Sequence, residues 1–234
     1  MKQQVDKLVG HSEHLLDAFL GLRQKVALLF PMVRNESLIV KYSRGAGAEG
    51  FLILRYTLFC SCAQDLVKLT TDTDKRTPSV ENLFSILQDV QVRNELRERY
   101  SAWCLPREAG HNEIETELQA HEMARRGELA KKFDDLFRKV GDGWANFKVQ
   151  PWLPGMQSLR DKHTAHLELR PTNHGYEPVG LEALNLKWGD VRDAVTRLEG
   201  LVLDLNVLSR QAGFMMDQAT DQFDRAATAF WEAS

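Results

Sequence analysis

FLILRYTLFCSCAQDLVKL, residues 51–69, is the stretch that decides the fold. Its apolar residues fall on nearly every side of a helix, which is typical of a helix buried at the centre of a bundle. Arg55 and Asp65 interrupt the run ten residues apart, about 15 Å along an ideal helix, which is too far for them to pair with each other. Because a buried unpaired charge is costly, we expect each to meet a partner from another helix, either in an ion pair that organises the core or in the lining of a site.

The segments on either side of this run have helical periodicity. From Val5 to Phe30, apolar residues recur every three or four positions, which predicts an amphipathic helix that ends at Pro31. Ser79 is a candidate N-cap after a polar break, in which Asp74, Arg76 and Thr77 are expected to build the turn. Further helices are expected over residues 79–90, 92–103, 112–147, 155–168, 188–212 and 214–231.

The long helix over 112–147 has an unusual pattern. Its middle, HEMARRGELAKK, contains few apolar residues, so we expect the helix to protrude or to pack against a partner chain. A loop is expected over 171–178 and a short extended piece over 179–187, and no pair of strands with an alternating pattern is evident. The sequence therefore predicts an all-α fold, a helical bundle with long helices, formed as a single domain over residues 1–234.

Composition indicates a soluble cytoplasmic protein. The apolar and charged fractions, 43% and 27%, are ordinary for a globular chain, and a net charge of -3 provides no overall attraction to nucleic acid. The cluster nearest to a basic patch contains Arg125, Arg126, Lys131 and Lys132. Three cysteines without a CxxC pair favour a reducing compartment, and the N-terminus does not resemble a signal peptide. No unbroken apolar run has the roughly 18 residues that a membrane span needs.

The candidate site is LRDKHTAHLEL, residues 159–169, which concentrates charged residues and histidines. One interpretation is a solvated helix face. A second is a metal site at His163 and His166, but zinc takes three or four ligands, and the remaining candidates, Glu168 and His174, have no diagnostic spacing. A third is metal-free chemistry on a phosphate, in which an arginine stabilises charge on the phosphate and a histidine transfers protons.

Arg160 and His166 are the pair that such phosphate chemistry would use. They are six residues apart, which is about 9 Å along an ideal helix and about 120° around it, so they cannot form one tight pair on a straight helix. A two-fold dimer that sets two such helices side by side would instead create a composite site with two arginines and two histidines. No metal and no cofactor are expected in this site.

Residues 160–166, RDKHTAH, resemble the R-x(4–6)-H motif of the HEPN superfamily, in which a polar residue follows the arginine. The rest of the chain is similar to the AbiU-like branch, which is named for phage abortive infection. The segments that carry this similarity are AFLGLRQKVALLFPM at 18–32, GFLILRYTLFCSCAQDLVKL at 50–69, DKRTPSVENL at 74–83, residues 159–168 and the WGD helix start at 188–190.

The resemblance implies an all-α and commonly dimeric protein, and many members of the superfamily are metal-independent endoribonucleases. It implies catalytic roles for Arg160, His166 and Asp161, and places Lys162 and His163 in the spacer as candidate RNA-binding residues. The expected partners are RNA, a second copy of the chain and an antitoxin protein. Two alternatives remain: a non-catalytic module that binds a nucleotide or a partner, and a toxin-like subunit that is active only after release from its antitoxin.

Overall fold

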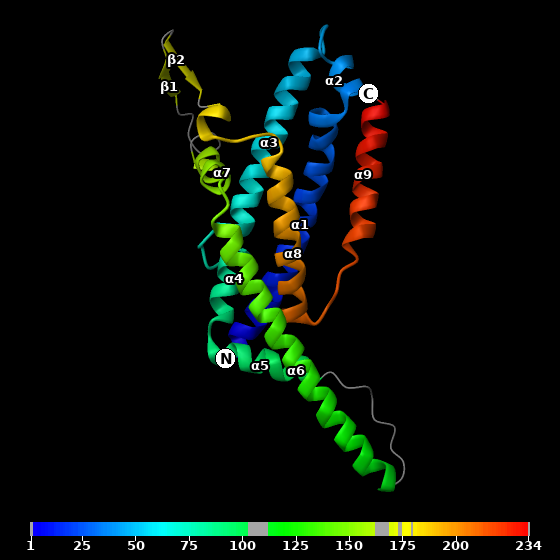
Figure 1. Cartoon of the computed structure of the whole chain (residues 1–234). Coiled ribbons are helices and arrows are strands. Elements are labelled where there is room, and N and C mark those ends of the chain that lie inside the picture. The colour runs from blue at the N-terminus through cyan, green and yellow to red at the C-terminus, as the bar shows by residue number, and fades with distance from the viewer. Residues whose placement is uncertain (1, 103–111, 162–168, 173–174, 179, 234) are drawn as a thin grey trace.

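The computed structural model describes residues 2–102, 112–161, 169–172, 175–178 and 180–233, and it describes side chains for all of these except 112–120, 169–172 and 175–178. In chain order, the elements are α1 (Lys2–Arg34), α2 (Glu36–Lys41), α3 (Ala48–Thr71), α4 (Val80–Leu87), α5 (Val90–Ser101), α6 (Asn112–Lys148), α7 (Leu153–Leu159), β1 (Leu169–Thr172), β2 (Gly175–Pro178), the 3₁₀ turn η2 (Glu182–Leu184), α8 (Asp190–Arg210) and α9 (Met216–Ala233). The fold is an all-α bundle, as the sequence predicts (Figure 1).

α1 lies at the centre of the bundle. It packs against α3, α8 and α9, and its lower end also contacts α4 and α5 (Figure 1). Leu8, Leu15, Phe19 and Leu22 of α1 have no solvent exposure, which accounts for the helical periodicity of this segment. The sequence therefore places the apolar stripe of this helix correctly.

Pro31 does not end α1, and that prediction is wrong. The helix continues to Arg34, and the amide of Asn35 still donates to the Pro31 carbonyl at 2.9 Å. A proline in the last turn costs only one helical hydrogen bond, and burial of Met32 beside it favours the continued turn. Asn35 then caps α2, because its side chain accepts from the Leu38 amide.

The polar break after α3 forms the turn and cap that the sequence predicts. The Asp74 carboxylate accepts from the Arg76 backbone amide at 3.0 Å and from its guanidinium at 2.7 Å, and the Thr77 amide donates to the Asp74 carbonyl at 2.8 Å. Ser79 is the N-cap of α4, with its hydroxyl accepting from the Asn82 amide. These short-range hydrogen bonds were predictable because each involves neighbours in sequence.

The strands Leu169–Thr172 and Gly175–Pro178 form a β-hairpin, which corrects the loop expected over 171–178. β1 pairs antiparallel with β2, from Leu169 opposite Pro178 to Thr172 opposite Gly175. Strands of four residues are too short to give a readable alternation, so the sequence showed no strand pair. The extended piece expected over 179–187 is also wrong, since residues 182–184 form the single turn η2.

The halves of α6 have different surroundings. From Ala130 onward the helix packs against α5 and α8 and buries Phe133, Val140, Trp144 and Phe147. Residues 121–129 bury no side chain, and Figure 1 shows this end of α6 extending away from the bundle. The basic residues of the HEMARRGELAKK segment are exposed there, and Arg126 forms an ion pair with Glu122 at 2.8 Å.

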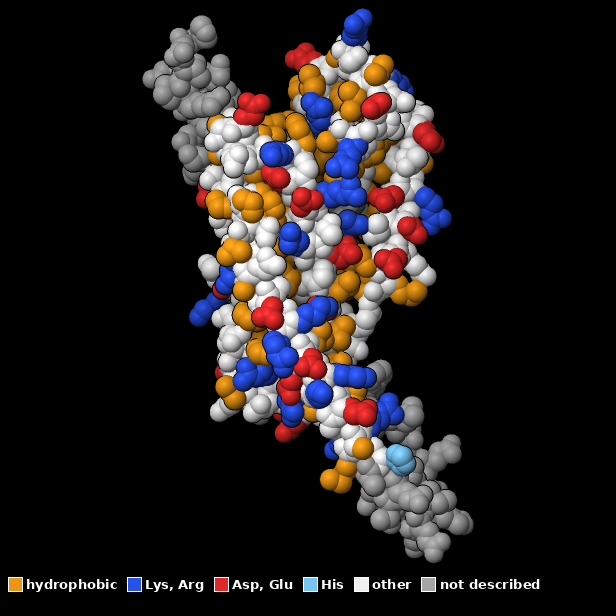
Figure 2. Space-filling model, in the orientation of Figure 1, with side chains coloured by type: hydrophobic (Ala, Val, Ile, Leu, Met, Phe, Trp, Pro, Cys, Tyr) orange, Lys and Arg blue, Asp and Glu red, His pale blue; other side chains and the backbone are white. Residues whose placement is uncertain are grey.

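α3 is buried mainly along its C-terminal half. Phe59, Cys62 and Leu66 are fully buried, whereas Leu52 is 52% and Ile53 60% exposed. The prediction of a helix covered along its whole length is therefore wrong for its first two turns. Hydrophobic side chains gather on the surface at the end of the bundle where α2 and α3 meet (Figure 2).

α3 also has the length and composition of a membrane span. Its most apolar 18-residue window has a mean hydropathy of 1.2, and 33% of that window is buried within the protein. Core helices of soluble proteins meet the same criterion, so the property assigns no membrane location.

The two charged residues of α3 have partners of different kinds. Asp65 forms an ion pair with Lys25 of α1 at 2.6 Å, and Lys25 also donates to the Ser61 hydroxyl at 2.9 Å. Arg55 instead lies over the Trp188 ring, with 4.8 Å between the guanidinium carbon and the ring centroid. Asp65 therefore joins α1 to α3, and Arg55 joins α3 to the residues that precede α8.

Candidate active site

α7 positions the arginine of the candidate motif. It packs against α3 through Leu153, Met156 and Leu159, all of which are buried. Gln157 donates from its side-chain amide to the Thr71 hydroxyl at the end of α3, at 3.3 Å. Three buried apolar residues in seven fix the rotation of this short helix, so the next residue, Arg160, projects from a defined place on the bundle.

Gly155 allows α7 to lie very close to η2. A Cβ at this position would be 2.5 Å from the Leu184 carbonyl oxygen and 2.9 Å from the Leu186 side chain. Because the clash would be with backbone, a larger residue would displace the whole of α7. This close approach was not predicted, and a glycine after a proline in the sequence gives no signal for it.

Arg160 and Asp161 lie at the exposed end of α7. Arg160 keeps a right-handed helical backbone, and its Nε donates to the Asp161 carboxylate at 2.8 Å. The side chains are 36% and 60% exposed, respectively. The carboxylate constrains the orientation of the guanidinium without removing it from solvent, which is suitable for a cation that must meet an incoming phosphate.

The remaining predicted site residues lie outside the described residues. These are Lys162, His163 and His166, together with the alternative metal ligands Glu168 and His174. The structure therefore brings Arg160 and Asp161 together and leaves the distance from Arg160 to His166 as a prediction. In the part of the chain that the structure describes, no group of three or more His, Cys, Asp or Glu side chains could hold a metal ion.

The two described cysteines are poorly placed to act as nucleophiles. Cys60 and Cys62 lie on the buried half of α3, and burial raises the pKa of both thiols, that of Cys62 to about 12. Burial, together with the neighbouring Cys60, also raises the pKa of the Tyr56 hydroxyl. Since only the thiolate attacks, burial and the raised pKa make both thiols poor nucleophiles at neutral pH.

The family model of AbiU2, a HEPN family, matches residues 6–230. This match spans nearly the whole chain, from α1 to the last helix. The chain belongs to the AbiU2 family. No curated protein and no solved structure shows significant similarity to it. Membership confirms the HEPN, AbiU-like resemblance and associates the AbiU2 chain with abortive infection, the process for which the family is named.

The AbiU2 chain places its two basic regions far apart. Figure 1 shows α7 and the hairpin at one end of the molecule and the protruding half of α6 at the other. Arg125 and Arg126 of α6 are therefore not neighbours of Arg160 within one protomer. Arg55 and Trp188 were also missed as a pair, because an arginine in an apolar run indicates that a partner exists but not which residue it is.

Proposed function

We propose that this AbiU2 protein is a metal-independent endoribonuclease that acts in the cytoplasm in phage or stress defence. Two features support the proposal: membership of a HEPN family over residues 6–230, and the exposed Arg160–Asp161 pair at the end of α7. The second feature is the one that carries it. A guanidinium that is oriented by an adjacent carboxylate and remains partly exposed to solvent is able to meet a phosphodiester, which supports the proposal.

The proposed reaction needs one arginine and two proton-transfer steps. Arg160 holds the non-bridging oxygens of the scissile phosphate, and Asp161 keeps the guanidinium in position. His166 removes the proton from the ribose 2′-hydroxyl, whose oxygen attacks phosphorus. The bond to the 5′-oxygen breaks as the partner's His166 protonates it, which yields a 2′,3′-cyclic phosphate and a 5′-hydroxyl. Lys162 and His163 would contact neighbouring phosphates.

A homodimer is part of this proposal. Arg160 and His166 are six residues apart, so a second copy of the motif would supply the groups that one chain cannot bring together. The exposed side chains of Leu52, Ile53 and Leu54 at the N-terminal end of α3 are the candidate surface for this dimer. If the protein acts as a toxin, an antitoxin would bind it and inhibit this activity.

Cleavage of total RNA in EDTA tests the function. Wild-type protein should cut RNA under these conditions, and Arg160→Ala and His166→Ala should each lower the rate by at least about 100-fold, since they remove phosphate stabilisation and proton transfer. New 5′ ends should accept a phosphate from polynucleotide kinase directly, as 5′-hydroxyls do. Arg197→Ala, an exposed arginine of α8, is the matched control and should cut normally.

The other outcomes identify the rivals. Cleavage that disappears in EDTA would contradict the metal-free mechanism and support a histidine metal site. Full activity in either motif variant would remove that residue from the site. Wild-type protein could also bind RNA or a nucleotide and cut nothing, both in the presence of a candidate antitoxin and after its removal. In that case the non-catalytic binding module is the better description.

A further inference from the structure

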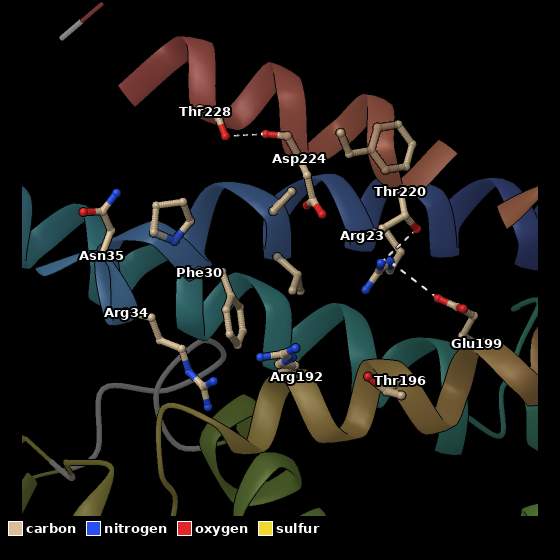
Figure 3. Close-up of a pocket in the computed structure, with 14 residues that line it drawn as sticks. Arg23, Phe30, Arg34, Asn35, Arg192, Thr196, Glu199, Thr220, Asp224 and Thr228 are labelled. Carbon is tan, nitrogen blue, oxygen red and sulfur yellow. Dashed lines mark hydrogen bonds and ion pairs between the residues drawn. The ribbon is translucent and has the colours of Figure 1, made fainter. Parts of the chain in front are cut away.

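A groove lies between α8 and α9 (Figure 3). The helix α9 lies on the opposite side of the bundle from α7 (Figure 1). α1 forms its floor through Val26, Ala27 and Phe30, and its volume is about 680 Å³. Cavities of about 300–1,000 Å³ are typical of small-molecule sites. No residue of α7 lines this groove, so it is separate from the motif that contains Arg160.

Hydrogen bonds hold the wall formed by α9 at both of its ends. Near one end, Arg23 of α1 donates to the Thr220 hydroxyl at 2.9 Å and lies 3.6 Å from the Glu199 carboxylate of α8. Near the other end, the Trp231 indole donates to the Leu28 carbonyl at 3.1 Å. The groove residues Asp224 and Thr228 lie between these two anchors. The hollow is therefore a fixed feature of three joined helices.

Two arginines project beside one aromatic ring at the end of the groove nearest α2. The guanidinium carbon of Arg192 lies 4.9 Å from the Phe30 ring centroid, and that of Arg34 lies 5.6 Å from it. A guanidinium that stacks on a ring contacts it through the flat face of the guanidinium. The N–H groups at the edge of the guanidinium remain able to bind an anion. Among the described residues, no carboxylate lies within 4.0 Å of Arg34 or Arg192, so neither cation is held in a close ion pair.

The acidic residues of the groove lie away from Arg34, Glu199 toward the other end and Asp224 in the middle. Glu199 faces Arg23, and Figure 3 shows the Asp224 side chain entering the groove from α9, away from Arg34. A carboxylate there repels an anion and accepts hydrogen bonds from hydroxyl groups. Thr196 adds a hydroxyl on the α8 side. The groove is thus polarised: one end suits an anion, and the middle suits a body that carries hydroxyl groups.

We propose that this groove binds a small organic phosphate, a phosphate monoester on a hydroxyl-bearing body of about mononucleotide size. Arg34 and Arg192 bind the phosphate oxygens, and Phe30 holds the two guanidiniums beside each other. Asp224 accepts from a hydroxyl of the body. Both arginines are exposed, so the affinity is modest and falls as salt concentration rises. The site is independent of RNA cleavage, and its test measures binding alone.

Calorimetric titration of the full chain with ribose 5-phosphate and with AMP tests the site, with adenosine and a ten-nucleotide RNA lacking terminal phosphates as separate arms. Wild-type protein should bind both phosphate monoesters. Arg34→Gln and Arg192→Gln should each weaken that binding on the order of tenfold, because each removes a charge-assisted contact. Arg197→Gln, on α8 but in a different surface hollow, should bind as wild type. Circular dichroism confirms that each variant is folded.

Five results would overturn the inference. Wild-type protein that binds neither monoester lacks the site. Unchanged affinity in both arginine variants places the ligand elsewhere, and equal loss in Arg197→Gln shows only a general charge effect. Adenosine binding as tight as that of AMP removes the phosphate from recognition. Binding of the RNA but of no monoester would make the groove part of an RNA path. An active nuclease that fails this test would leave the proposed function intact.

Discussion

The two halves of α3 are both rich in apolar residues, yet only one is covered. Its C-terminal half packs among α1, α4, α7 and α8 and buries Phe59 and Leu66 completely. At its other end only Phe51 is buried, in a small cluster with Met32, Leu38 and Trp231, while Leu52 and Ile53 face solvent. This difference shows that an apolar run predicts a surface that will be buried. It does not show whether the same chain or a second chain buries it.

The largest effect is expected for removing a ring from the covered half. Phe59 is fully buried and contacts Trp188 edge to face at 5.1 Å between centroids, so Phe59→Ala should lower the free energy of unfolding by about 3–5 kcal/mol. Leu52→Ala, the matched change in the exposed half, should cost less than about 0.5 kcal/mol. Urea unfolding of both variants makes the comparison. Equal losses would show that the halves do not differ.

The next effect concerns assembly rather than folding. If a second copy covers the exposed turns, Leu52→Glu with Ile53→Glu should weaken the dimer by about 100-fold, close to 3 kcal/mol, because two apolar side chains are lost from the contact. The melting temperature of the separated protomers should remain close to that of wild type. Analytical ultracentrifugation over a concentration series measures this. A wild-type chain that is monomeric at every concentration would contradict the proposed dimer. Dimers that persist in the variant would show that the interface lies on another surface.

A smaller effect is expected at the ion pair between α3 and α1. The side chains of Lys25 and Asp65 are 39% and 32% exposed, so solvent screens their attraction, and Asp65→Asn should cost about 1 kcal/mol. Asp135→Asn is a suitable control, because the pair that Asp135 forms with Arg138 is more exposed and should contribute less. Thermal unfolding at low and high salt distinguishes the two. A loss at Asp65 that does not shrink with salt would contradict an electrostatic origin.

The smallest effect lies in the turn that follows the covered half. Hydrogen bonds from the Arg76 guanidinium and backbone amide lower the pKa of Asp74 to about 2 from its ordinary 3.8. A folded pKa below the unfolded one means that the pair stabilises the fold above pH 3.8 and that this contribution disappears as the pH falls toward 2. Arg76→Gln should bring the pKa of Asp74 back toward its ordinary value. Carboxyl-carbon NMR titration measures it, and an unchanged pKa would reject the guanidinium as the main cause.

Local patterns predicted most of the helices and some of their ends. The periodicity of α1, the Ser79 cap and the extent of α8 each follow from residues within one or two turns, and the sequence contains that information. The predictions at Pro31 and at the hairpin were wrong because local patterns did not contain the information that decides them. Packing of Met32 continued a helix past a proline, and strands of four residues are shorter than the pattern needed to recognise them.

The sites divide in the same way. Arg160 and Asp161 are adjacent in sequence, so their proximity was predictable from the motif alone. Arg34 and Arg192 are separated by all the elements from α2 to η2, and they meet because α8 packs on α1, so no spacing rule could pair them. Lys25 was likewise an unpredicted partner of Asp65. Tertiary packing creates such pairs, and one sequence shows that a charge needs a partner without identifying it.

The uncovered turns of α6 have a thermodynamic consequence of their own. Residues 121–129 bury no side chain, so the bundle contributes little to keeping them helical, and isolated helical turns are marginal in water. Heating should therefore unwind this end of α6 gradually, as a steady loss of ellipticity at 222 nm well before the bundle unfolds. Tryptophan fluorescence, to which the buried Trp144, Trp152 and Trp231 contribute, should change little over that range, so the two signals separate at temperatures where the bundle is still folded.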